Sequence, residues 1–224
     1  PLVRLRLLEA YEANPSGMPI DKQGYILNIK GLLYYYLGDY KEAEPLMKRA
    51  VEIFEKSLGK GHPNVATALN NLALLYQEMN RLAEAEPLYK RAMAIDEASF
   101  GKDHPKVATD LNNLAQLYQA TNRLADAEPM MKRALAIDEA SFGKDHPEVA
   151  TDLNNLAELY RATNRLSDAE PLMKRALAID EASFGKDHPE VATNLNNLAG
   201  LYKDTNRLAE AETMMKRALA IDEA

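Results

Sequence analysis

The feature that most constrains this chain is an internal repeat with a period of 42 residues. The tetrapeptide Asn-Asn-Leu-Ala begins at Asn70 and returns at Asn112, Asn154 and Asn196. His-Pro pairs and Lys-Arg-Ala triplets return at the same interval. A period of this length indicates a supersecondary unit that buries its apolar face only by stacking on its neighbours. The chain is therefore expected to be an array of similar units.

Each unit is interpreted as two helices. In the third complete unit, apolar residues between Val107 and Tyr118 recur every three or four positions, which predicts a first helix over about 105–120. A second stripe with the same spacing predicts a helix over about 124–141. No segment alternates with the period of two that strands require. The fold class is therefore predicted to be all-α.

Turn residues support these boundaries. Asn122 and Gly143 are expected to end the two helices in the left-handed conformation. Asp145 or His146 then supplies the next N-cap, with Pro147 at the first helical position. The second helices also carry prolines about two turns in, such as Pro129, where proline removes a backbone hydrogen bond. Either a kink or a late helix start is expected there.

The repeat divides the chain into one continuous domain of stacked units. Residues 1–17 align with the end of a second helix, and both ends of the sequence fall inside a repeat, as in a segment of a longer array. The expected units are a preceding tail at 1–17, a divergent repeat at 18–59, three repeats at 60–101, 102–143 and 144–185, and a truncated repeat at 186–224.

Composition excludes several classes of function. The net charge of −7 argues against a nucleic-acid partner, because phosphates require a basic surface. No apolar run is long enough to span a membrane, so no membrane association is expected. The chain has no cysteine, which is consistent with a reducing compartment, and we expect a cytoplasmic location. No cofactor is expected.

Other recurring polar residues have structural interpretations. The four histidines lie one per repeat, each beside a proline, so they do not converge as zinc ligands do, and we expect them in loops or at N-caps. The Lys-Arg ladder on the second helices is expected to be a solvated face, with Glu128 and Lys132 as an i,i+4 pair. No acid, base or nucleophile has a convergent partner, so the segment is predicted not to be an enzyme.

The helix pair resembles a tetratricopeptide repeat. Leu72, Ala73 and Tyr76 occupy the first helix of a unit, and Ala85 and Tyr89 the second. The 42-residue form, with its Asn-Asn-Leu-Ala and Gly-Lys-Asp-His-Pro motifs, is similar to the repeats of kinesin light chains and their bacterial relatives. This resemblance implies a right-handed superhelical solenoid whose concave groove is lined by first helices and takes a peptide.

The resemblance also implies which residues face the groove. In relatives, the second asparagine of each pair binds a ligand backbone, and an amide does so without reading sequence. Tyr35 and Tyr36 of the divergent unit would offer rigid apolar anchors. The expected groove residues are Asn71, Asn113, Asn155, Asn197, Tyr35, Tyr36, Gln77, Gln119, Arg161 and Lys203. The alternative for the asparagines is capping or bonding between helices.

These observations predict a scaffold that binds a partner protein or peptide. The first helices carry few cations, so an acidic ligand would gain little from charge attraction. An alternative is a sensor or regulatory module of a longer enzyme or nucleotide-switch protein. End-to-end self-association through the truncated last repeat is a further expectation. Near-identical units would also fit a consensus-designed array, although the divergent first unit argues for a natural origin.

Overall fold

The computed structural model describes residues 19–223, and this part of the chain contains ten α-helices and no strand. The helices are α2 (Ile20–Tyr36), α3 (Tyr40–Leu58), α4 (Pro63–Glu78), α5 (Leu82–Phe100), α6 (Pro105–Ala120), α7 (Leu124–Phe142), α8 (Pro147–Ala162), α9 (Leu166–Phe184), α10 (Pro189–Asp204) and α11 (Leu208–Asp222). The all-α prediction is confirmed. The predicted helices of the third unit agree with α6 and α7 to within one residue.

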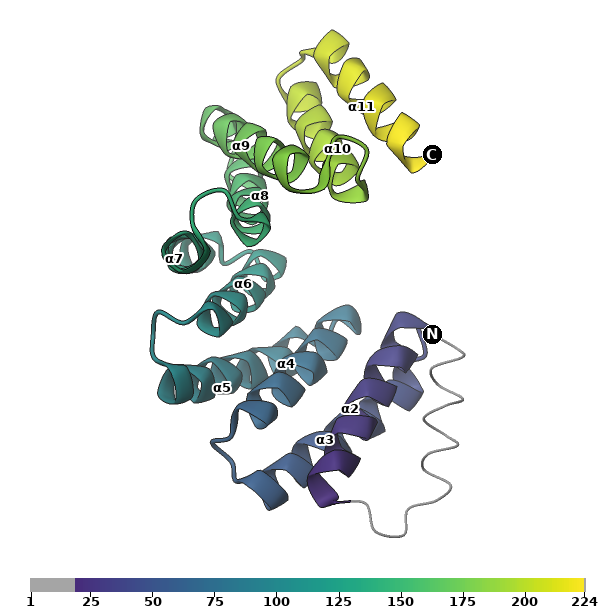
Figure 1. Ribbon diagram of the computed structural model, residues 1–224, viewed down its shortest axis with the longest axis vertical. Coiled ribbons are helices and arrows are strands. Elements are labelled where there is room, and N and C mark those ends of the chain that lie inside the picture. The colour runs from purple at the N-terminus through teal and green to yellow at the C-terminus, as the bar shows by residue number, and fades with distance from the viewer. Residues whose placement is uncertain (1–18, 224) are drawn as a thin grey trace. The chain divides into compact units, whose positions relative to one another are not determined.

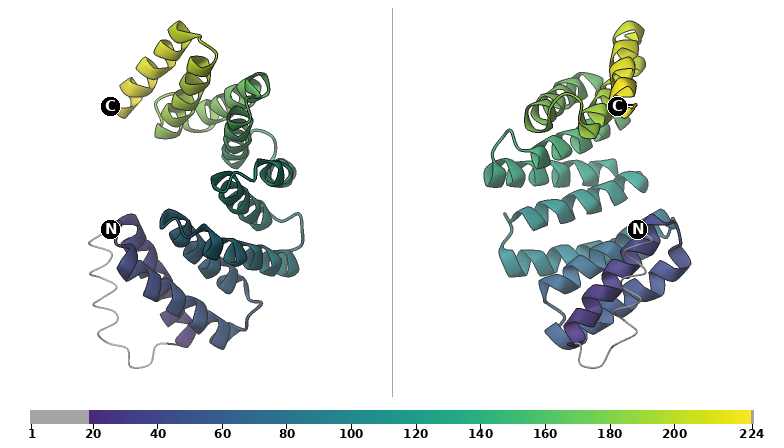
Figure 2. Two further views of the ribbon diagram at one scale, coloured as in Figure 1. Left: turned by 180° about the vertical axis from the view of Figure 1, so that it is seen from behind. Right: turned by 45° about the vertical axis from the view of Figure 1, so that its right-hand side comes forward.

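The chain forms two compact units, divided between Leu117 and Tyr118. Within each unit the helices pack as consecutive hairpins, of which α2–α3, α4–α5, α8–α9 and α10–α11 are visible in Figure 1. First helices also contact one another directly, α2 with α4 and α8 with α10. The reverse view in Figure 2 shows the same pairing of α8 with α9 and α10 with α11. First helices of neighbouring repeats therefore lie side by side within each unit.

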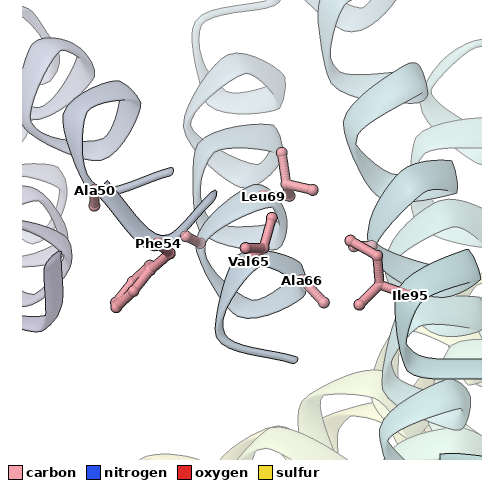
Figure 3. Packing of buried hydrophobic residues seen from close by; sticks show 8 residues of the cluster. Ala50, Phe54, Val65, Ala66, Leu69 and Ile95 are labelled. Atoms are coloured by element: carbon pink, nitrogen blue, oxygen red, sulfur yellow. The ribbon is translucent and has the colours of Figure 1, made fainter. Parts of the chain in front are cut away.

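The core of the first unit lies where α3, α4 and α5 meet. Phe54, Val65 and Leu69 are almost fully buried there, and alanines such as Ala66 let the helices approach closely (Figure 3). Burial of this apolar surface is the main force that holds one hairpin to the next. The second unit repeats the arrangement around Leu153.

The helix ends follow the turn chemistry of the sequence. Asn122 adopts a φ of 57°, as predicted for the left-handed residue after a first helix. His146 is the N-cap of α8, with its Nδ1 accepting a hydrogen bond of 3.2 Å from the Glu148 backbone N–H. The expected role of the histidines is therefore confirmed. Phe142 stacks on the His146 ring at 4.6 Å and holds it in place.

Gly143 differs from the expectation. Its φ of 91° and ψ of 159° are not left-handed helical but lie in an extended region open essentially only to glycine. The chain therefore leaves α7 in an extended direction.

The prolines of the second helices do not delay the helix start, so that alternative is wrong. α7 begins at Leu124 and continues through Pro129. Pro129 and Ala125, whose carbonyl loses its helical partner, are both exposed. The freed carbonyl is therefore on the solvent side of the helix, where access to water lowers the cost of the proline.

The predicted tail of a preceding repeat at residues 1–17 lies outside the described residues. Within residues 19–223, every helix is too short or too polar to cross a membrane.

Candidate functional site

The asparagine pairs lie on the first helices, at the contacts between neighbouring repeats. The first asparagine of a pair bonds across to the next first helix. Asn70 Nδ2 donates to Asp110 Oδ1 at 2.5 Å, and Asn154 Nδ2 donates to Asn194 Oδ1 at 2.5 Å. These bonds join α4 to α6 and α8 to α10. The first asparagine therefore has a structural role in these two contacts.

The second asparagines behave differently. Asn71 Nδ2 donates to Asn28 Oδ1 at 3.1 Å, so this member bonds between helices. Asn113, Asn155 and Asn197 are half-buried, and their amides form no hydrogen bond with any residue in 19–223. An amide has two donors and an accepting oxygen, all of which need partners. These three side chains are therefore free to bind an external group.

The second predicted position on each first helix lies four residues before the arginine of the following turn, and its side chains mostly have partners inside the protein. Gln77 Oε1 accepts a hydrogen bond of 3.4 Å from the Tyr89 hydroxyl. Arg161 is ion-paired with Asp204 and, at 3.4 Å, with Glu158. Gln119 is half-buried and Lys203 is exposed. Of these residues, Lys203 is the most accessible to a ligand.

Gly200 explains how Arg161 reaches its partners. A Cβ at Gly200 would lie 2.9 Å from the guanidinium of Arg161, so a larger residue would displace it. The glycine lies on α10, one repeat after Glu158. Asp204 and Glu158 neutralise the only arginine among the predicted groove residues, so Arg161 adds little net positive charge to this surface.

The tyrosines of the divergent unit form an aromatic cluster on α2 and the start of α3. The Tyr35 ring lies 5.3 Å from Tyr36 and 5.9 Å from Tyr40. Tyr36 is 72% exposed, the largest exposure among the large apolar side chains in the described part of the chain. Burial, with help from Glu78, raises the pKa of Tyr35, so its hydroxyl stays neutral. The cluster therefore offers apolar ring area together with hydroxyl groups that can form hydrogen bonds.

The Lys-Arg ladder is neutralised within the second helices. Each lysine forms an i,i+4 ion pair of 2.6–2.7 Å, in the pairs Glu44–Lys48, Glu86–Lys90, Glu128–Lys132, Glu170–Lys174 and Glu212–Lys216. The predicted Glu128–Lys132 pair is thus confirmed. A track for polyanions would need uncompensated cations, which this ladder does not provide.

A clamp between repeats was missed by the sequence analysis. Arg165 reaches back to Glu128 at 2.8 Å and lies 3.9 Å from the centre of the Tyr160 ring. Arg165, with Lys132, lowers the pKa of Glu128 to about 2. The same contacts join Arg81 to Glu44 and Arg207 to Glu170. The recurring Asn-Arg-Leu sequence was the available signal, because an invariant arginine at a turn indicates a fixed partner.

Buried carboxylates were also missed. Asp96, Asp110, Asp138, Asp152 and Asp180 are each at most 5% exposed. Helical spacing carried a signal, since Asp96 follows the buried Ala92 by four residues and so lies on the same face. Asp96 and Asp110 line one polar pocket of about 220 Å³ together with Asn70, Asn71 and Asn113. The two carboxyl groups are therefore adjacent to the candidate binding surface.

The last helix exposes an apolar face. Leu208, Met215 and Leu219 of α11 surround a pocket of about 450 Å³. Met215 corresponds to Met173, which is fully buried one repeat earlier. This face is the region to which the self-association prediction applies.

Comparison with known proteins identifies the class. The tetratricopeptide repeat family model matches residues 24–98, 81–140, 123–182 and 168–224. The chain is therefore an all-helical repeat protein and belongs to the tetratricopeptide repeat family. Within that family it is kinesin-light-chain-like. A search of curated proteins finds no match.

Solved structures agree on the fold. BtubC (BKLC) from P. vanneervenii is 26% identical, with a TM-score of 0.78, and the match covers 98% of this chain and 87% of that chain. A Podosopora anserina protein described as a kinesin light chain with nearly identical TPR-like repeats is 24% identical, with a TM-score of 0.74 and coverage of 91% and 96%. The apo form of RapI is 12% identical, with a TM-score of 0.69 and coverage of 99% and 90%.

Proposed function

We propose that this protein is a non-catalytic scaffold that binds a peptide segment of a partner protein on its first helices. Tetratricopeptide repeats generally mediate protein–protein interaction and are typically non-catalytic. The observation that carries the proposal is the set of unbonded amides at Asn113, Asn155 and Asn197. An asparagine in a helix interior competes with the backbone and is unfavourable there, so three at equivalent positions indicate a use.

The chemistry of the surface favours a peptide backbone as the ligand. A backbone presents alternating N–H and C=O groups, and an asparagine amide can pair with both. The amides recur once per repeat, at equivalent positions of the first helices. The aromatic cluster at Tyr35, Tyr36 and Tyr40 adds an apolar anchor site, because exposed tyrosine rings bury large area at low entropic cost.

Charge on the first helices argues against a strongly acidic ligand. Arg161 is already paired with Asp204 and Glu158. We therefore propose that the partner segment is neutral or basic, with aromatic or aliphatic anchors. The affinity of this protein for the partner segment should depend only weakly on salt concentration. Salt mainly screens exposed charge pairs, and the proposed contacts are amide hydrogen bonds and apolar anchors.

The test is recovery of a partner from the native source, followed by titration of that partner against two variants. Tyr36→Ala should weaken binding by about 10-fold or more, as loss of a hot-spot aromatic does. Asn113→Ala should weaken it by about 2- to 10-fold, the value of one or two hydrogen bonds. Isothermal titration calorimetry would measure both.

Lys90→Ala is the matched control, because Lys90 lies exposed on a second helix, where it forms an i,i+4 ion pair with Glu86. It should leave affinity unchanged. The proposal fails if Tyr36→Ala and Asn113→Ala bind like the parent protein. A loss confined to Lys90→Ala would place the binding surface on the second helices instead.

A further inference from the structure

Two buried carboxyl groups lie in the pocket between α4, α5 and α6. Asp96 is 4% exposed and Asp110 is 1% exposed. Asp110 Oδ1 accepts the hydrogen bond from Asn70, but its Oδ2 has no partner among residues 19–223. Asp96 forms no hydrogen bond there either. Two carboxylates with unpartnered oxygens in one buried site would be strongly unfavourable if both were ionised.

The equivalent position in the second compact unit shows which hydrogen bonds such a site requires. Asn194 on α10 stands two repeats after Asp110, and Asp180 on α9 stands two repeats after Asp96. Asn194 Oδ1 accepts a hydrogen bond from Asn154, as Asp110 Oδ1 does from Asn70. The other end of the Asn194 side chain, Nδ2, donates to Asp180 Oδ2 at 2.7 Å. The atom that faces the second-helix aspartate is therefore a donor.

Asparagine and a protonated aspartate have nearly the same shape, and both present one acceptor and one donor group. With its Oδ1 engaged by Asn70, Asp110 can reproduce the Asn194 arrangement only if Oδ2 carries a proton. An ionised Asp110 has no donor to offer Asp96. Comparison of this site with the Asp180–Asn194 site therefore indicates that Asp96 and Asp110 share one proton.

Some charged groups around the pocket favour ionisation of the two carboxyl groups, and others oppose it. Lys106 lines the same pocket and favours the ionised forms, but its Nζ also lies 4.7 Å over the Phe100 ring. His104 also favours ionised Asp96, whereas Glu97 opposes ionisation of Asp110. Among the residues that line the pocket, α4 contributes hydroxyl and amide groups and no charge. Burial, together with Asp96, outweighs the hydrogen bond from Asn70 and the charge of Lys106 and raises the pKa of Asp110 to about 7.

We propose that Asp96 and Asp110 form a proton-binding site, in which Asp110 Oδ2 donates its proton to the Asp96 carboxylate. This site goes beyond the proposed binding function and does not depend on it. Because the pocket also contains Asn71 and Asn113, its protonation state bears directly on the candidate binding surface.

The sign of the resulting pH dependence follows from linkage. In the unfolded chain an aspartate ionises near about pH 3.9, whereas the folded pair holds its proton to about pH 7. Between these values the folded state binds more protons than the unfolded state. The proton site therefore stabilises the fold most at acidic pH, and this contribution is lost as pH rises through about 7. Carboxylates whose pKa is lowered by cationic partners, such as Glu128, produce the opposite trend.

The experiment exchanges the residues at the two equivalent positions, 110 and 194. Asp110→Asn copies Asn194, and Asn194→Asp copies Asp110. Asp110→Asn should raise the melting temperature at pH 8 by on the order of 5 °C, and should raise it by clearly less at pH 5. Asn194→Asp should lower it at pH 8 more than at pH 5. Asp103→Asn, in the exposed loop before α6, is the control and should change neither value.

Other buried aspartates, such as Asp138, whose pKa burial raises to about 6, will keep some pH dependence in every variant. The quantity to compare is therefore the difference in melting temperature between each variant and the parent protein at each pH. Carboxyl ¹³C NMR of the parent protein gives a direct reading that needs no variant to fold. One of the pair, Asp96 or Asp110, should titrate near neutral pH. The proposal is overturned if both titrate near about pH 4, or if Asp110→Asn keeps the pH profile of the parent.

Discussion

Replacement of Phe54 by alanine is expected to lower the free energy of unfolding by about 3–5 kcal/mol. Phe54 is 1% exposed and lies at the contact between α3 and α4 (Figure 3). Its ring meets Tyr25 edge-on at 5.1 Å. A Cβ at Gly24 would lie only 2.8 Å from the ring, so the α2 backbone packs directly on it. Removal of the ring would leave a cavity that three helices cannot close.

Urea denaturation would measure this loss, and hydrogen exchange would show whether it concentrates in α2–α4, since repeat units stabilise mainly their neighbours. Phe142→Ala is the control of the same chemistry. Phe142 is 43% exposed and stacks on His146, so its loss should cost about 1 kcal/mol or less. Equal losses in the two variants would contradict the burial argument.

The second large effect is expected at the end of α3, where Gly59→Ala should cost about 1–3 kcal/mol. Gly59 has a φ of 90° and a ψ of 153°, a conformation that a Cβ disfavours strongly. No atom lies within 4 Å of the Cβ position, so the cost is backbone strain and not a clash. Thermal unfolding of the variant would give the value.

Gly61 provides a control in the same loop. It also has no atom within 4 Å of its Cβ position, but its φ is not positive. Gly61→Ala should therefore be neutral, or should stabilise by a few tenths of a kcal/mol through the unfolded chain. A cost at Gly61 as large as that at Gly59 would show that the loop, and not the φ angle, determines the effect.

The sequence was sufficient for the helices because their determinants are local. Three features can be read within a few residues of sequence, and the structure confirms them. They are the apolar spacing, the left-handed asparagine after a first helix, as at Asn122, and the helix start at His146–Pro147. The prolines were ambiguous for the same reason. Local chemistry shows what Pro129 removes from the helix, but only the solvent exposure of the packed helix shows that water can replace it.

The candidate site was predicted less completely. The 42-residue period placed Asn71 and Asn113 at equivalent positions, yet Asn71 bonds to Asn28 and Asn113 has no partner in the described chain. The difference depends on which side chain the neighbouring helix presents. Arg161 likewise needed knowledge of Asp204, which lies 43 residues away in sequence. Equivalent position in a repeat therefore does not ensure an equivalent environment.

Periodicity and turn chemistry by themselves determined that this chain is an all-α array with one helical hairpin per 42 residues. Only the tertiary structure decided which polar groups are buried and what they face. Asp96 and Asp110 lie in different helices, and neither looks unusual in its own segment. Packing removes both from water and directs them into one pocket, and the cost of two charges there depends on distance and solvent access, which a sequence does not contain.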